Sequence, residues 1–276
     1  MTDQRPGDFE AFKEFEHDGW DKVSYSYHDS IERITRQAAQ PLLDAVEAGS
    51  GVRLLDVACG TGYVAALATS QGAATIGLDF VASMVDEAKK LHPSTEFREG
   101  DAEALPFPDE SFDAVVCSFG ILHFPHSERA IAEVHRVLAP GGRFAFTAWF
   151  PREKSPYFAN FFGAVETYGD MNVPLPPGPP FFRYGDLDEC RRTLSAYGFS
   201  DATFVELPLI VKLDDEREVL EPLYRGSVRS RNLLLAQQED VRIRIEQAAI
   251  EGARQYRHGD TIEIPIPALL AAARKP

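Results

Sequence analysis

Strand-like apolar runs alternate with amphipathic stretches through the middle of the chain. The strand-like runs occupy residues 52–58, 74–79, 94–101, 114–120 and 143–150. The helix-like stretches between them include residues 62–70, 82–91 and 127–138. Short strands separated by helices predict a mostly parallel sheet with helices on both faces. Right-handed crossovers then give an α/β, doubly wound, Rossmann-like fold.

The segments outside this alternating region predict a cap and the completion of the sheet. They read as helices (8–48), a proline-rich wall or lid (151–185), a helix (186–198), a strand (202–213) and two or three helices (215–257). The last run, residues 261–275, predicts an antiparallel edge strand, because Pro265 and Pro267 are tolerated only at an edge or a bulge.

This order predicts three regions within one structural domain. Residues 1–50 form an N-terminal helical cap, residues 51–150 the Rossmann-like core, and residues 151–276 the rest of the sheet. Two insertions in the last region, 151–185 and 213–260, are expected to contribute to a substrate pocket.

Acidic residues outnumber basic ones, which excludes some classes of partner. The 276 residues include 28 Lys and Arg against 43 Asp and Glu, a formal net charge of −15. Such a charge repels a phosphate backbone and an anionic bilayer, so neither nucleic acid nor a membrane is expected as a partner. No apolar run reaches the roughly 20 residues needed to span a bilayer.

The cysteines and histidines predict neither disulfides nor a metal. Cys59, Cys117 and Cys190 form no CxxC pair, and the N-terminus has no basic start followed by an apolar stretch. This pattern is typical of a reduced cytoplasmic protein. His123 and His126 lack the spacing of a helix-borne metal-binding pair, so no metal site is expected.

A glycine turn follows the first predicted strand. Asp56 stands at the end of that strand, residues 60–62 read Gly-Thr-Gly, and Asp79 follows Gly60 by 19 residues. Glycine lets the backbone approach a ligand closely, and the carboxylate of Asp79 can accept both hydroxyls of a ribose. Residues 60–65 also fit the dinucleotide pattern GxGxxA, so one function that this turn permits is that of an NAD-dependent oxidoreductase. Asp56 would oppose the pyrophosphate of NAD, whereas it favours a cationic ligand.

Four stretches of the chain resemble the motifs of class I S-adenosylmethionine-dependent methyltransferases. They are residues 54–62, 77–90, 99–124 and 133–149, and together they cover the predicted core. The pattern is similar to the ubiquinone/menaquinone-biosynthesis type of methyltransferase and its natural-product relatives, the methyltransferase type 11 group. Residues 181–199 and the final strand also resemble that group.

The resemblance implies S-adenosylmethionine as cofactor, S-adenosylhomocysteine as product, and roles for matching positions. Asp56 and the glycine turn would hold the methionine part, Asp79 would bind the ribose, and Asp101 would accept the adenine amino group. The implied cofactor-binding set is Asp56, Ala58, Gly60, Thr61, Gly62, Asp79, Phe80, Met84, Gly100, Asp101, Ala102, Glu103, Ser118 and Phe119.

Methyl transfer requires mainly that nucleophile, methyl and sulfur be held in line away from water. A hydroxyl or amine acceptor also benefits from a base. His123, just past the fourth predicted strand, is the best-placed candidate, with a buried structural histidine as the alternative. Tyr25 is the second candidate. With Tyr27 and His28 it could close over the cofactor, or it could simply pack the N-terminal helix.

Further residues bear on the methyl acceptor. Arg225 and Arg229 are spaced i, i+4, so a shared helix face could pair with an anionic substrate group or form a solvated ion-paired surface. An apolar or aromatic acceptor is indicated by the aromatics Trp20, Phe158, Phe161, Phe162, Tyr168, Phe181 and Phe182.

We therefore expect a methyltransferase that acts on a small apolar or aromatic metabolite, as a monomer or homodimer. A non-catalytic sensor of S-adenosylmethionine is a further alternative, which a blocked acceptor pocket would favour. The sequence leaves open which metabolite is methylated and whether carbon, oxygen or nitrogen receives the methyl group.

Overall fold

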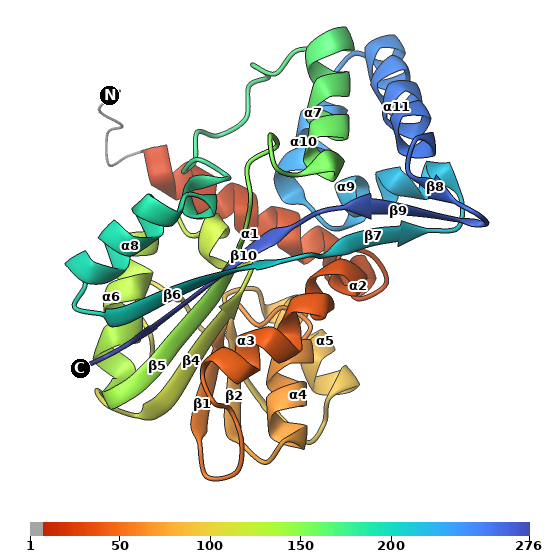
Figure 1. The fold of residues 1–276 in the computed structure, drawn as a ribbon. Coiled ribbons are helices and arrows are strands. Elements are labelled where there is room, and N and C mark those ends of the chain that lie inside the picture. Colours follow the sequence, from red (N-terminus) through yellow and green to blue (C-terminus); the bar gives the residue numbers. More distant parts are fainter. Residues whose placement is uncertain (1–7) are drawn as a thin grey trace.

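The structure, a computed structural model, describes residues 8–276 and is built on a seven-stranded sheet (Figure 1). The sheet has the order β3-β2-β1-β4-β5-β10-β6. Its strands are β1 (Arg53–Val57), β2 (Ala74–Asp79), β3 (Glu96–Glu99), β4 (Phe112–Ser118), β5 (Leu138–Trp149), β6 (Ser200–Leu207) and β10 (Ala268–Arg274). The first five strands are parallel, and β10 runs antiparallel to both β5 and β6. The predicted α/β fold with an antiparallel last strand is confirmed.

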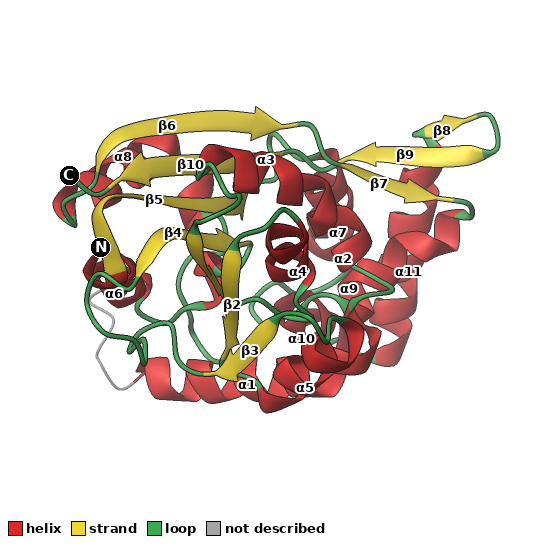
Figure 2. Ribbon diagram, turned by 90° about the horizontal axis from the view of Figure 1, so that it is seen from below, coloured by secondary structure: helices red, strands yellow, loops and turns green. Residues whose placement is uncertain are grey.

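Helices cover both faces of the sheet (Figure 2), because successive strand residues point to opposite sides. Leu54 and Val116 share one buried cluster with α3 and α4, whereas Leu55 and Val115 belong to a second cluster with α6 and α8. The helices are α3 (Ala39–Ala45), α4 (Tyr63–Ser70), α5 (Ala82–Leu91), α6 (Ser127–Val137) and α8 (Leu187–Ala196). α5 packs against α4 and β3 through Val85, Ala88 and Phe97.

The remaining helices lie outside these two layers, and we call them the cap. They are α1 (Asp8–Tyr27), α2 (Glu32–Thr35), α7 (Pro156–Tyr168), α9 (Glu221–Arg225), α10 (Val228–Leu235) and α11 (Glu239–Arg254). In Figure 1, α1 crosses between the sheet and the helices α7, α9, α10 and α11. A second sheet, of order β7-β9-β8, extends the cap with β7 (Ile210–Leu213), β8 (Arg257–His258) and β9 (Thr261–Pro265). Short 3-10 helices are η1 (Arg36–Ala38), η2 (Ile121–His123), η3 (Arg183–Gly185) and η4 (Glu216–Leu220).

Two predicted strands differ from the structure. The run 202–213 divides at Pro208 into β6 and β7, which belong to different sheets. The run 261–275 divides into β9 and β10, and neither is an edge strand. β9 lies between β7 and β8, and β10 lies between β5 and β6. The prolines explain both divisions. A residue without a backbone N–H interrupts the hydrogen bonds to the neighbouring strand, so the chain can leave one sheet and join another.

Two element boundaries also differ. Pro156 lies in the first turn of α7, a position that proline favours, but the aromatic content of 151–185 concealed this helix. The predicted helix 127–138 and the predicted strand 143–150 leave Pro140, Gly141 and Gly142 between them, outside both elements. Instead β5 begins at Leu138, and its pairing with β4 shifts register between Phe112 and Ala114. No helix within residues 8–276 is long and apolar enough to cross a bilayer.

Candidate functional site

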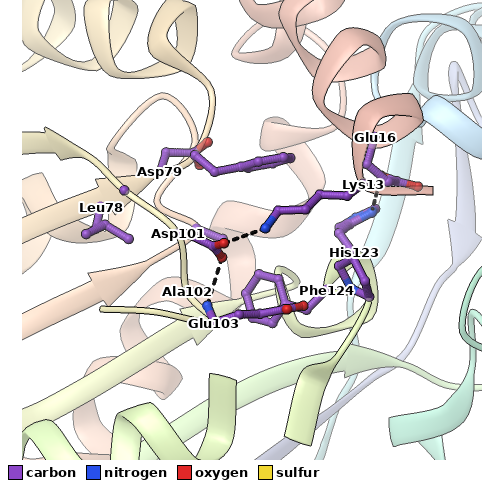
Figure 3. Close-up of a pocket in the computed structure, with 13 residues that line it drawn as sticks. Lys13, Glu16, Leu78, Asp79, Asp101, Ala102, Glu103, His123 and Phe124 are labelled. Carbon is purple, nitrogen blue, oxygen red and sulfur yellow. Dashed lines mark hydrogen bonds and ion pairs between the residues drawn. The ribbon is translucent and has the colours of Figure 1, made fainter. Parts of the chain in front are cut away.

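The carboxyl ends of β1, β2 and β4 meet beneath α1, where three adjoining cavities share Ala58 as a lining residue. Figure 3 shows the first of them. The sequence-predicted residues that line at least one of the three are Asp56, Ala58, Gly60, Thr61, Asp79, Phe80, Met84, Gly100, Asp101, Ala102, Glu103, Ser118, Phe119 and His123. Gly62 lies behind them as the left-handed N-cap of α4.

Asp79 joins two of the strand-end loops. Its Oδ2 accepts a hydrogen bond from the backbone N–H of Gly60 (2.8 Å), and its Oδ1 accepts one from Val81 (3.0 Å). Burial raises the pKa of this carboxyl above its ordinary value, and the two N–H groups oppose the rise. Each oxygen keeps a second lone pair, so the carboxylate can still accept a pair of ligand hydroxyls.

Asp56 presents an unpartnered oxygen. Its Oδ2 accepts the N–H of Ala65 (3.0 Å), whereas Oδ1 is buried and has no hydrogen-bond partner among the described residues. Burial raises the pKa of Asp56 to about 8, and the nearby Asp79 adds to the rise. A buried carboxylate without a partner is costly, so a cationic ligand group in the third cavity would supply the missing contact.

The backbone is strained where these loops line the cavities. Ala58 and Phe119, just after β1 and β4, have φ angles of +56° and +55°. Such angles cost a non-glycine residue on the order of 1 kcal/mol or more and are concentrated at functional sites. The backbone N–H of Phe119 donates to Thr147 Oγ1 (3.0 Å), which fixes the turn after β4.

The first cavity ends at Asp101, whose carboxylate is already engaged. Lys13 Nζ lies 2.5 Å from Oδ2, and the backbone N–H of Glu103 donates to Oδ1 (2.8 Å). Figure 3 shows Lys13 reaching down from α1 onto Asp101. A ligand amino group at this carboxylate would therefore share it with Lys13 or displace Lys13.

Four residues of α1 contribute to the site, and two of them, Lys13 and Glu16, were not predicted. Lys13, Glu16, Trp20 and Tyr27 line the first or second cavity. Their spacing of i, i+3, i+7 and i+14 places them on one helix face. That periodicity is the signal in the sequence that groups them, although it does not say which surface the shared face covers.

Glu16 is the most buried of these, with none of its surface exposed. Its Oε2 accepts hydrogen bonds from His123 Nδ1 (2.9 Å) and Trp20 Nε1 (3.0 Å), and its Oε1 from Arg229 Nε (3.3 Å). Burial alone would raise the pKa of Glu16, but His123 and Arg229 outweigh it and hold the pKa below its ordinary value. The carboxylate is therefore ionised.

The third cavity has polar walls from α2 and η1. Thr61 Oγ1 donates to Glu32 Oε2 (2.6 Å), and Arg36 lies 3.8 Å from the same carboxylate and above the ring of Tyr63. Glu32 and Arg36 both line the cavity that Asp56 faces. This end of the site thus carries groups of both charges, as a ligand with an ammonium and a carboxylate would require.

A fourth cavity shares His123 as a lining residue with the first and second cavities. All three predicted pocket regions contribute to it: the N-terminal helices, the segment 151–185 and the segment 213–260. Its lining residues are Ile31, His123, Trp149, Tyr157, Phe158, Phe181, Pro222, Leu223, Gly226, Ser227, Ser230 and Ile266. Of the aromatics expected for an acceptor, Phe158 and Phe181 line this cavity. Tyr168 is 47% exposed, and Trp20 lines the second cavity instead.

The structure places two sets of candidate residues differently from the sequence prediction. Tyr25 is 66% exposed, lies beneath the ammonium of Lys90 and lines none of the four cavities, because it occupies the outer face of α1. Arg225 and Arg229 do not share a helix, because α9 ends at Arg225 and α10 begins at Val228. Arg225 pairs with Glu221 on the surface (2.9 Å), whereas Arg229 is turned inward toward Glu16.

Comparison with known proteins identifies the class. Residues 55–146 match the methyltransferase domain family. A demethylmenaquinone methyltransferase of Renibacterium salmoninarum is 43% identical over 109 residues, 40% of this chain and 46% of that protein. One of Paenarthrobacter aurescens is 34% identical over 183 residues, 63% of this chain and 72% of that protein. The chain spans about half the length of several other such relatives.

Solved structures agree on the fold. Phosphoethanolamine N-methyltransferase 2 of Haemonchus contortus, in complex with phosphomonomethylethanolamine and S-adenosylhomocysteine, is similar with a TM-score of 0.56 and 19% identity. The match covers 95% of this chain and 60% of that one. The chain belongs to the family of S-adenosylmethionine-dependent methyltransferases, and S-adenosylmethionine is its cofactor. The membership favours a methyltransferase over the alternative of an NAD-dependent oxidoreductase.

Proposed function

We propose that the chain transfers the methyl group of S-adenosylmethionine to a small apolar or aromatic acceptor held in the fourth cavity. The observation that carries this proposal is the position of His123. The same side chain lines the first and second cavities, where cofactor residues gather, and the aromatic fourth cavity. Two ligands that meet at one side chain are arranged for transfer between them.

The cofactor would lie along the strand ends in an extended form. Asp101 would accept the adenine amino group, and Asp79 the ribose hydroxyls. The methionine end would occupy the third cavity, where the unpartnered Oδ1 of Asp56 fits an ammonium group. Arg36 lines the same cavity and fits the methionine carboxylate.

The aromatic lining supports the class of acceptor. The rings of Trp149 and Phe158 lie 5.7 Å apart at nearly right angles, and those of Phe158 and Phe181 lie 5.9 Å apart. Such edge-to-face clusters accept a further aromatic ring well. Relatives named demethylmenaquinone methyltransferase point to the same kind of acceptor.

The residues would act mainly by position. When bound, S-adenosylmethionine supplies a methyl group on a sulfonium that is already activated toward nucleophiles. Asp56 and Asp79 hold the ligand's polar groups, α1 covers them from solvent, and the aromatic cavity fixes the acceptor. Holding two reactants at contact distance contributes on the order of 7–11 kcal/mol to lowering a barrier.

The proposal is tested by screening aromatic metabolites for release of S-adenosylhomocysteine. Turnover with an aromatic acceptor, lost in Asp79→Asn and retained in Asp86→Asn, would support it. Asp86 is a matched control, because it is an exposed aspartate on α5 close to the site. A protein that binds S-adenosylmethionine but methylates no acceptor would instead fit the sensor alternative.

A further inference from the structure

Glu16 and His123 form a buried contact between two residues that lie far apart in the sequence. Glu16 comes from α1 and His123 from η2, 107 residues later, and they meet at 2.9 Å with Glu16 fully buried. Removing a carboxylate from water costs several kcal/mol unless it is well paired. Three donors, from α1 itself, η2 and α10, compensate Glu16 here. None of these hydrogen bonds involves Asp56, Asp79 or Asp101.

This arrangement fixes the chemical state of the imidazole. A ring nitrogen that bonds to an ionised carboxylate must be an N–H donor, so Nδ1 of His123 carries a proton. In the neutral ring, Nε2 is then the nitrogen with a free lone pair. The rings of His123 and Trp20 also meet nearly at right angles, with a centroid distance of 4.9 Å, and this contact restricts rotation of the imidazole.

We infer that Glu16 is a positioning residue that holds His123 as the base for an acceptor hydroxyl, and that the acceptor is therefore an aromatic alcohol methylated on oxygen. This inference rests on the proposed function. The hydroxyl oxygen forms a bond to the methyl carbon, and the carbon–sulfur bond breaks with its electron pair going to sulfur. The hydroxyl proton passes to Nε2 of His123. The products are the methyl ether, S-adenosylhomocysteine and an imidazolium that the carboxylate of Glu16 stabilises.

The position of the base favours oxygen as the acceptor atom. His123 lines both the second and the fourth cavity, so a base there lies beside the place where the proposal brings the two ligands together. A hydroxyl carries its proton on the nucleophilic atom itself, so the base and the nucleophile meet at one place. A ring carbon activated by a hydroxyl would need the base at a different atom, and a neutral amine needs no base to attack.

The first test measures which ring nitrogen of His123 carries the proton, and it needs no methyl acceptor. Nitrogen-15 spectra of the S-adenosylhomocysteine complex should show the proton on Nδ1 of His123 in the wild type and in Glu14→Gln. Glu14 is the control, because it is an exposed glutamate on the same helix. In Glu16→Gln this preference should be lost. A proton on Nε2 in the wild type would overturn the inference.

The second test uses 1-naphthol, which offers a hydroxyl and free ring carbons on one molecule. The wild type should yield the methyl ether. Glu16→Gln should lower kcat about 100-fold, in the range that a general base contributes, while KM for S-adenosylmethionine changes less than about twofold. Glu16→Asp, which keeps the charge, should recover part of the loss even if Glu16→Gln is poorly stable.

The outcomes separate the inference from the proposed function. Ring-methylated product, turnover of amines or carbon acceptors alone, or full activity in Glu16→Gln would overturn the inference and leave the methyltransferase proposal standing. If no acceptor of any class is methylated, the proposed function fails, and the tautomer of His123 alone decides the role of Glu16.

Discussion

The glycine turn allows a prediction in which stability and binding respond to different residues. Gly60 and Gly62 both have left-handed φ angles, +54° and +86°. A Cβ added at Gly62 would lie 2.5 Å from Cζ of Phe97 and 3.0 Å from Cβ of Ala88. A Cβ added at Gly60 would meet Cε1 of Tyr27 at 3.6 Å, an ordinary contact.

The expected losses of stability follow from these distances. A non-glycine residue in the left-handed region costs about 1–2 kcal/mol, and this applies to both Gly60→Ala and Gly62→Ala. Overpacking adds about 1–3 kcal/mol, and this applies to Gly62 alone. The free energy of unfolding should therefore fall by about 1–2 kcal/mol in Gly60→Ala and by about 2–5 kcal/mol in Gly62→Ala.

The losses of affinity for S-adenosylhomocysteine should rank the two glycine variants in the opposite order. Gly60 lines the second and third cavities, whereas Gly62 lines none of the three at the strand ends. Urea unfolding measures stability, and calorimetry with S-adenosylhomocysteine measures affinity. Gly60→Ala should lose more affinity and Gly62→Ala more stability. Adding Phe97→Leu to Gly62→Ala should recover stability, because leucine is shorter than phenylalanine and leaves room for the methyl group of Ala at position 62. The same ranking of the two glycines in both assays would refute this account of the turn.

Three further predictions concern charge and the acceptor cavity. Burial raises the pKa of Asp56 to about 8, so binding a cation near neutral pH must expel its proton. The Kd for S-adenosylhomocysteine should fall about tenfold between pH 7 and pH 9, and Asp56→Asn should lose this dependence. Phe158→Leu should raise the acceptor KM in a steady-state assay while calorimetry finds cofactor affinity unchanged; equal losses of both would contradict a separate acceptor cavity. Arg225→Ala, which removes an exposed ion pair, should change stability in urea by less than about 1 kcal/mol.

The strand-end residues were predictable because chain order dictates where parallel strands end. Once β1, β2 and β4 were recognised, Asp56, Asp79 and Ser118 had to gather at one edge of the sheet. The structure brings them to adjoining cavities. No knowledge of side-chain packing was needed for this part of the site.

The contribution of α1 could not be predicted in the same way. Periodicity shows that Glu16 and Trp20 share a helix face, but it does not say which surface the face covers. Their contacts with His123 depend on how the cap docks on the sheet. The error at Arg225 and Arg229 has a similar cause, because i, i+4 spacing implies a shared face only if no helix end intervenes.

The most direct test of the central claim is calorimetric titration with S-adenosylmethionine, S-adenosylhomocysteine and NADH, repeated on Asp79→Ala. The two sulfur compounds are expected to bind with micromolar affinity and to lose that affinity in the variant, because Asp79 lines the first cavity, where the proposal places the adenosine. Binding of NADH in their place would contradict the account and transfer Asp79 to the ribose of a nicotinamide cofactor.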